Sequence, residues 1–114
     1  MKILFIKEKR SFSGIEGIGT YLVQVCKRLN EMKIPYLVIY DDKDQLYEMM
    51  QENNIKVKIM DLPSKSFKNL IHNRKKVLRT RTLISKLVRE EKITHINVHF
   101  PHLIQYIDKN LNIP

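Results

Sequence analysis

The sequence predicts an α/β fold, a Rossmann-like three-layer sandwich in which helices cover both faces of a parallel sheet. Short apolar runs alternate with amphipathic stretches along the whole chain, in the order strand, helix, strand, helix. The first apolar run is followed by all three glycines of the chain, Gly14, Gly17 and Gly19, and then by a helical pattern. The connections are short, so right-handed crossovers favour the strand order 3-2-1-4.

The first strand is predicted at residues 3–6, an unbroken apolar run that suits a strand buried on both faces. A helix of about 15 residues follows the glycine-rich loop, because apolar residues recur there at spacings of three and four. Its expected buried face comprises Ile18, Tyr21, Leu22, Val25, Cys26, Leu29 and Met32. Cys26, the single cysteine, is therefore expected to be a buried core thiol rather than a reactive one.

The second strand is predicted at residues 36–40, a β-branched and aromatic run that begins after Pro35 has ended the first helix. Asp42 and Gln45 have the spacing of a capping box for the second helix. The inner face of that helix would carry Leu46, Met49 and Met50.

Residues 53–54, both asparagine, suit a left-handed cap at the end of the second helix. The third strand is predicted at residues 55–60, where Val57 and Ile59 alternate with lysines. Since only one face of this strand is apolar, we expect it at an edge of the sheet.

A third helix is predicted from about residue 76 to about residue 91. Its apolar stripe would comprise Val77, Arg81, Ile84, Leu87 and Val88. Phe67, Leu70 and Ile71 suggest a shorter helical turn before it, broken near residues 72–73. The fourth strand is expected within residues 93–100, and Pro101 suits the first turn of a last helix. The inner face of this last helix would carry Leu103, Ile104, Ile107 and Leu111.

The composition indicates one globular domain over residues 1–114. With 43% apolar and 29% charged residues the chain does not resemble a disordered protein, and no apolar run approaches the roughly 20 residues of a membrane span. The N-terminal run MKILFI is too short for a signal peptide. We therefore expect a cytoplasmic protein.

The positive charge is concentrated in residues 65–92, which hold ten Lys or Arg against two Glu and so carry nearly all of the net +9. Such a segment either faces an anionic partner or is a solvated helix face. The side chains expected to meet an anionic membrane are Arg74, Lys75, Lys76, Arg79 and Arg81. The segment lacks the interleaved aromatic residues of nucleic-acid binders, so we expect no nucleic-acid partner.

Two stretches of the chain contain recognisable motifs. The first is the opening strand with Ser-Gly-Ile-Glu-Gly-Ile-Gly-Thr-Tyr-Leu after it, at residues 13–22, and it resembles the start of the family 4 glycosyltransferases. The second, at residues 90–102, is similar to the fourth strand of that family, typically Lys-x-Asp-Ile-Ile-His-Val-His-x-Pro. Thr94 stands where the family usually has Asp, Asn97 replaces the first His of the pair, and His99 keeps the second.

This resemblance implies an incomplete N-terminal domain of the GT-B fold, lacking its last strands and the C-terminal donor domain. The whole enzyme would be a retaining, metal-independent glycosyltransferase that moves a sugar from a nucleotide sugar to an envelope glycan or lipid-linked acceptor. The resemblance assigns acceptor binding to this chain, without a cofactor of its own, because the nucleotide-sugar donor is expected only with the missing domain. The expected partners are a sugar acceptor, an anionic membrane surface on the inner face, and a C-terminal domain or partner chain. Alone, the fragment is expected to be inactive.

The resemblance and the position after parallel strands together nominate Gly17, Gly19, Thr20, His99 and His102 as substrate-binding residues. A purely structural role remains open for these residues, since glycine serves a tight turn equally well and a histidine at a strand end often only packs against its neighbours. A dinucleotide fingerprint would need a further glycine where the chain has Leu22. No catalytic residue and no metal site is expected, because the histidines at 95, 99 and 102 have only Asp108 as a nearby acid.

A second hypothesis comes from another class of protein. The chain would be a non-catalytic interaction module, either one chain of a split transferase or a decayed remnant, with a basic membrane-binding helix.

Overall fold

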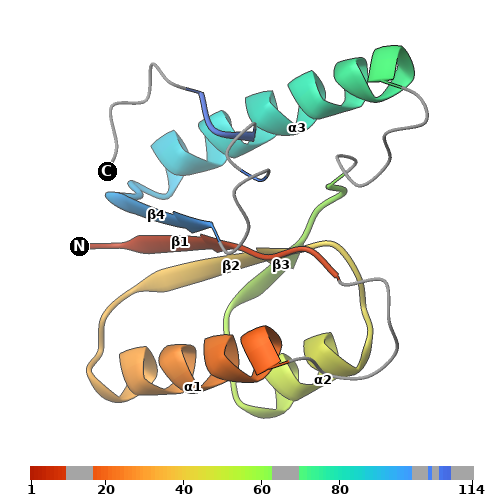
Figure 1. The fold of residues 1–114 in the computed structure, drawn as a ribbon. Coiled ribbons are helices and arrows are strands. Elements are labelled where there is room, and N and C mark those ends of the chain that lie inside the picture. Colours follow the sequence, from red (N-terminus) through yellow and green to blue (C-terminus); the bar gives the residue numbers. More distant parts are fainter. Residues whose placement is uncertain (10–16, 63–69, 99–102, 104–105, 109–114) are drawn as a thin grey trace.

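The computed structural model describes residues 1–9, 17–62, 70–98, 103 and 106–108. The elements alternate along the chain as predicted (Figure 1). They are β1 (Ile3–Ile6), α1 (Gly17–Glu31), β2 (Tyr36–Tyr40), α2 (Gln45–Glu52), β3 (Val57–Ile59), α3 (Leu70–Glu90) and β4 (His95–Val98).

The four strands form one parallel sheet in the order β3-β2-β1-β4, which confirms the predicted topology. The central strands β1 and β2 are almost wholly buried, whereas β3 and β4 alternate between half-buried and exposed residues. A strand covered on both faces needs a continuous apolar run, and an edge strand needs only one apolar face. The prediction that residues 55–60 lie at an edge is confirmed, although the strand itself is the shorter β3.

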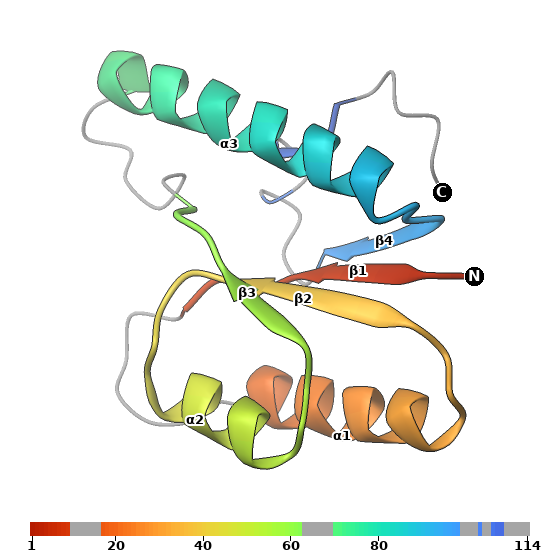
Figure 2. The same ribbon diagram turned by 180° about the vertical axis from the view of Figure 1, so that it is seen from behind.

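Helices cover both faces of the sheet, with α1 and α2 on one face and α3 on the other (Figures 1 and 2). The core between the sheet and α1 and α2 consists of Phe5, Leu22, Val23, Cys26, Leu29, Tyr36, Val38, Tyr40, Leu46, Met50 and Ile55. The core on the α3 face consists of Leu4, Ile6, Ile39, Leu62, Val77, Ile84, Leu87, Val88, Ile93, Leu103 and Tyr106. The predicted three-layer arrangement is therefore confirmed.

The buried face of α1 differs from the predicted one. Ile18, Tyr21 and Met32 are 37%, 65% and 55% exposed, while Val23, absent from the predicted face, is buried. The apolar residues of α1 cover a wider arc of the helix than the sheet and α2 can bury, so the predicted set combined two rows of side chains. Cys26 is fully buried as predicted, and burial raises the pKa of its thiol to about 12.

The N-terminal cap of α2 is Asp44, and the prediction of Asp42 was wrong. Asp44 has an extended backbone, and its Oδ1 accepts a hydrogen bond from the Tyr47 backbone N–H at 3.1 Å. The side chain of Asp42 is engaged elsewhere, in an ion pair with Lys9. At the other end of α2, Asn54 has a φ of 58°, which confirms the left-handed cap predicted there.

The helix α3 is continuous from Leu70, so the break expected near residues 72–73 is absent and the two predicted helical pieces are one. Histidine and asparagine have only modestly lower helix propensity than alanine, and packing of the later turns outweighs it. In the predicted stripe Arg81 is half-buried and the other four residues are buried. Of the predicted last helix, Leu103 is buried and Ile107 is half-buried; Ile104 and Leu111, like Phe67 before α3, lie outside the described residues.

Candidate functional site

The carboxyl ends of β1 and β2 lie side by side at one edge of the sheet, because the strands are parallel and in register. Ligands of open α/β sheets bind at this edge, where the chain leaves the sheet for the following helices. The backbone N–H of Lys7 donates to the Ile39 carbonyl at 3.0 Å, so the pairing of the two strands continues to their ends. The residues that follow both strands are charged, and their side chains form the candidate site.

Two charged residues directly after β1 are buried. Lys7 is fully buried and Glu8 is 6% exposed, and the Lys7 Nζ donates to the Glu8 carbonyl at 2.7 Å. Fully burying an ionised side chain costs free energy that hydrogen bonds must offset, so such residues are rare in a core and concentrate at functional sites. The sequence analysis did not single them out. A Lys-Glu pair that directly follows a wholly apolar parallel strand is the signal that would have found them.

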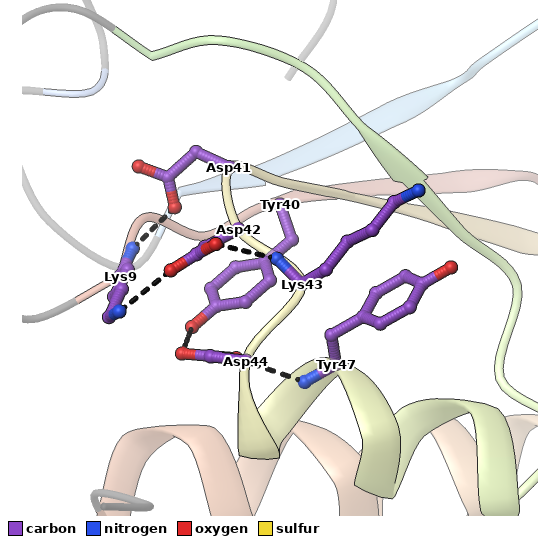
Figure 3. A network of polar contacts seen from close by, with 7 residues as sticks. All are labelled: Lys9, Tyr40, Asp41, Asp42, Lys43, Asp44 and Tyr47. Carbon is purple, nitrogen blue, oxygen red and sulfur yellow. Dashed lines mark hydrogen bonds and ion pairs between the residues drawn. The ribbon is translucent and has the colours of Figure 1, made fainter. Parts of the chain in front are cut away.

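Lys9 connects the end of β1 to the residues after β2 (Figure 3). Its backbone N–H donates to Asp41 Oδ1 at 2.7 Å, and its Nζ pairs with Asp42 Oδ2 at 2.7 Å. The hydrogen bond that Lys9 Nζ donates to the Asp42 carboxylate, together with the charge of that carboxylate, raises the pKa of Lys9 above the usual 10.5, so the ammonium form persists at neutral pH. Asp42 also accepts from the Lys43 backbone N–H at 2.8 Å.

A second branch of this network lies beneath the first (Figure 3). The Tyr40 hydroxyl donates to Asp44 Oδ2 at 2.8 Å, while the other oxygen of Asp44 caps α2. Burial of the ring, followed by the neighbouring Asp44 carboxylate, raises the pKa of Tyr40, so its hydroxyl stays protonated and acts as a donor. The two carboxylates therefore fix the loop between β2 and α2 to β1 and to the first turn of α2.

The first turn of α1 contains three of the predicted substrate-binding residues, and the structure separates their roles. A Cβ added to Gly17 would meet no atom within 4 Å, so this position is open. A Cβ added to Gly19 would lie 2.8 Å from Leu46 Cδ2, which shows that the absence of a side chain lets α1 approach α2 closely. Thr20 is exposed. Gly19 thus has a packing reason of its own, whereas the space beside Gly17 is open.

The other two predicted substrate-binding residues, His99 and His102, lie outside the described residues. Of the three histidines weighed as a metal set, only His95 is described; it is exposed, and its Nδ1 lies 2.9 Å from Thr94 Oγ1. Within residues 1–9, 17–62, 70–98, 103 and 106–108, no group of three His, Cys, Asp or Glu side chains is placed to hold a metal ion.

The basic residues nominated for membrane contact lie on α3, on the opposite face of the sheet from α1 and α2. Arg74, Lys75, Lys76 and Arg79 are exposed and Arg81 is half-buried. Leu78 and Leu83, 46% and 47% exposed, lie among the basic side chains on the outer surface of the same helix. No helix in the part of the chain that the structure describes has both the length and the apolar character of a membrane span.

The sequence and the fold that carry these features were compared with those of known proteins. No protein-family model matches the sequence, and no curated protein sequence matches it. Among solved structures, a glycosyltransferase from Rickettsia africae ESF-5 is similar with a TM-score of 0.73 and 16% identity, over 92% of this chain and 25% of that one. MurG from Acinetobacter baumannii is similar with a TM-score of 0.71 and 13% identity, over 99% of this chain and 33% of that one.

The chain therefore spans only a quarter to a third of the length of these two proteins. At such low identities the likeness shows the fold alone. The fold that the resemblance implied is confirmed, and the chain has the Rossmann-like fold of part of a GT-B glycosyltransferase.

Proposed function

We propose that this chain is the acceptor-binding part of a retaining glycosyltransferase that transfers a sugar from a nucleotide sugar to an envelope glycan or lipid-linked acceptor. The observation that carries the proposal is the likeness of nearly the whole chain to part of two glycosyltransferase structures. The polar edge of the sheet supports it, since charged groups and backbone donors meet there beside the open start of α1.

In this proposal the acceptor lies over the ends of β1 and β2. Gly17 lets the sugar approach the first turn of α1, where backbone N–H groups have no partner within the helix. Lys9 and Asp42 offer an ammonium and a carboxylate that can exchange their mutual bond for bonds to sugar hydroxyl groups. Thr20, His99 and His102 complete the proposed substrate-binding set. The donor nucleotide would be held by a separate C-terminal domain or partner chain.

The test is a titration of the isotope-labelled chain with a panel of methyl glycosides, followed by two-dimensional amide NMR. We expect saturable shifts for the amides of Gly17 and Thr20 and of residues 9 and 41–43, because these line the proposed site. Gly17→Val should abolish the shifts, because it fills the open position at the start of α1. The matched control is Gln24→Val, another exposed position of α1. Shifts that stay confined to other surfaces, or that survive Gly17→Val, would contradict the proposal.

The alternative function is a non-catalytic interaction module with a basic membrane-binding helix, peripheral on the inner face of the membrane. The exposed Leu78 and Leu83 favour it, because two apolar side chains among basic ones can enter the headgroup region of a membrane. Each Lys or Arg near an anionic surface contributes about 1 kcal/mol. Together, several such contacts would bind the chain reversibly.

Vesicle co-sedimentation tests this alternative, with phosphatidylglycerol vesicles and phosphatidylcholine vesicles side by side. We expect binding to the anionic vesicles only, weakened by added salt. Replacement of Arg74, Lys75, Lys76 and Arg79 by Ser should abolish it. Leu78→Ser with Leu83→Ser should weaken binding even though the charge is unchanged. If the folded chain binds neither vesicle, the basic residues form a solvated helix face.

A further inference from the structure

The helix α1 has more apolar side chains than the fold buries. One row, which includes Leu22, Cys26 and Leu29, faces the core. A second row on the neighbouring flank stays accessible, with Ile18, Tyr21 and Met32 exposed and Val25 half-buried. Large apolar side chains that gather in a row on a surface mark an interaction site more often than isolated ones do.

The accessible row has the spacing of a helix–helix contact. Ile18, Tyr21, Val25, Arg28 and Met32 follow one another at intervals of three, four, three and four residues. We refer to these five residues as the α1 seam. A 3-4-3-4 repeat places side chains along one side of a helix and is the pattern by which two helices interlock. The α1 seam is therefore shaped for a second helix.

The α1 seam lies on the flank of α1 that is turned away from α2. Gly19 marks the opposite flank, since it approaches Leu46 of α2. With 3.6 residues per turn, Tyr21 and Val25 point more than a quarter turn away from Gly19. Among the elements that the structure describes, α2 therefore cannot cover the seam, which leaves it accessible to a helix of a second copy.

The order of residues in the α1 seam is nearly symmetric about its centre. Ile18 and Met32 both lie seven residues from Val25, and Tyr21 and Arg28 lie four before it and three after it. An antiparallel copy of the same helix would bring Val25 against itself and Ile18 against Met32. It would also place the Arg28 guanidinium beside the Tyr21 ring, a favourable cation–π pair. The seam is therefore complementary to itself.

The distribution of charge favours the same arrangement. The seven Lys and Arg of α3 and its single Glu lie on the other face of the sheet from α1. The helix α1 has two basic residues and one acidic residue. Two copies that meet through α1 keep their basic helices apart, whereas contact through α3 would bring like charges together.

We propose that two copies of this chain form a dimer in which their α1 helices pack antiparallel along the α1 seam, about a two-fold axis at Val25. A contact in which the same patch is used twice is the commonest form of protein dimer. The contact runs along one helix of 15 residues, which is about 22 Å long. We therefore expect the buried area to be smaller than the roughly 1,200–2,000 Å² of a stable interface. Dimerisation should therefore depend on concentration. It does not rest on the proposed glycosyltransferase function.

Sedimentation velocity of the full chain over a range of concentrations tests the dimer. We expect the sedimentation coefficient to rise with concentration towards that of a dimer. Tyr21→Glu with Met32→Glu should weaken dimerisation by at least about tenfold, because both side chains are more than half exposed and each would place a charge in the contact. Lys27 is exposed on another side of α1, and Lys27→Gln changes the charge by the same amount as each of the two Glu substitutions. This control variant should dimerise as the native chain does.

Circular dichroism of each variant verifies that the fold is retained. A chain that stays monomeric at every concentration would overturn the proposal. A dimer that persists unchanged in the Tyr21→Glu, Met32→Glu variant would overturn it as well.

Disulfide cross-linking tests the direction of the helices. A disulfide requires Cα atoms within about 7 Å, so Val25→Cys should cross-link at the two-fold axis. Ile18→Cys should not, because in an antiparallel pair it meets Met32 instead of its own copy. Lys27→Cys provides the background, since the native Cys26 is buried and its high pKa keeps the thiol protonated. Cross-linking through Ile18→Cys at the rate of Val25→Cys would indicate parallel helices and would overturn the antiparallel arrangement.

Discussion

The two faces of the sheet are covered in different ways. On one face the core lies beneath two neighbouring helices, and its side chains come mainly from α1, α2, β1 and β2. On the other face the long helix α3 is joined by Leu62, Leu103 and Tyr106, which belong to the segments after β3 and β4. The first face follows from local repeats in the sequence, while the second depends on residues brought together from distant parts of the chain. The predicted stripe of α3 was nevertheless the more accurate one: four of its five residues are buried, whereas Ile18, Tyr21 and Met32 of the predicted α1 face are exposed.

The largest effect is expected from truncation in the α3 core. Ile84 is fully buried there, and Ile84→Ala should lower the free energy of unfolding by about 2–5 kcal/mol, because it removes buried methyl groups and leaves a cavity. The neighbouring Leu83 is 47% exposed, so Leu83→Ala should change stability by less than about 0.5 kcal/mol. Urea denaturation followed by circular dichroism measures both. Equal losses of stability in the two variants would mean that α3 does not bury the side that carries Ile84 in solution.

On the α1 and α2 face, the cap of α2 gives the next largest effect. Asp44→Ala should cost about 1–3 kcal/mol, because it removes the cap and leaves the buried Tyr40 hydroxyl without its acceptor. Asp42→Ala should cost less than about 1 kcal/mol, since it removes an ion pair with Lys9 that is partly exposed on both sides. Urea denaturation of the two variants compares them directly. If Asp42→Ala proves the more damaging, the predicted capping box would describe the helix better than Asp44 does.

This difference between two aspartates shows what the sequence leaves open. Asp42 and Asp44 both stand between a strand and a helix, and both lie within reach of a capping position. The selection of Asp44 depends on Tyr40 of β2, which donates to Asp44, and on Lys9 after β1, which pairs with Asp42. Local spacing identifies the cap to within two residues, and only the sheet determines which carboxylate is used.

The same reasoning separates what was predictable in the fold from what was not. The topology followed from the apolar runs, because β1 and β2 are continuous and β3 alternates. The exposed row of α1 could not be separated from its buried row, since spacings of three and four are common to both. For the candidate site, the glycine-rich loop pointed to Gly17, whose surroundings are open, whereas the burial of Lys7 depends on the layers around it.

Substitution of the two glycines at the start of α1 should have a smaller effect on stability, and it tests how closely α1 packs on α2. Gly19→Ala should be less stable than Gly17→Ala by about 1 kcal/mol, because its Cβ would press on the methyl groups of Leu46, which is buried and must shift. Gly17→Ala should be neutral or stabilising by a few tenths of a kcal/mol, since nothing lies near and alanine suits a helix better. Thermal unfolding compares the two. If the clash with Leu46 causes this difference, Gly19→Ala should no longer lower the stability when it is introduced into a Leu46→Ala background.

The smallest effect concerns the ion pair that joins the end of α3 to the start of β1. Lys2 Nζ lies 2.6 Å from Glu91 Oε2, and this hydrogen bond and charge lower the pKa of Glu91 from its usual 4.5. A carboxylate with a lowered pKa in the folded state stabilises the fold above the unfolded value of 4.5 and loses that contribution as the pH falls through the folded value. We therefore expect Glu91→Gln to have a lower urea midpoint than the native chain at pH values well above 4.5, and the two midpoints to converge as the solution is acidified. Glu90→Gln, at the preceding residue, is the charge-matched control, because it removes only an exposed pair with Lys86. A difference as large in this variant would show that net charge, not the Lys2 contact, sets the pH dependence.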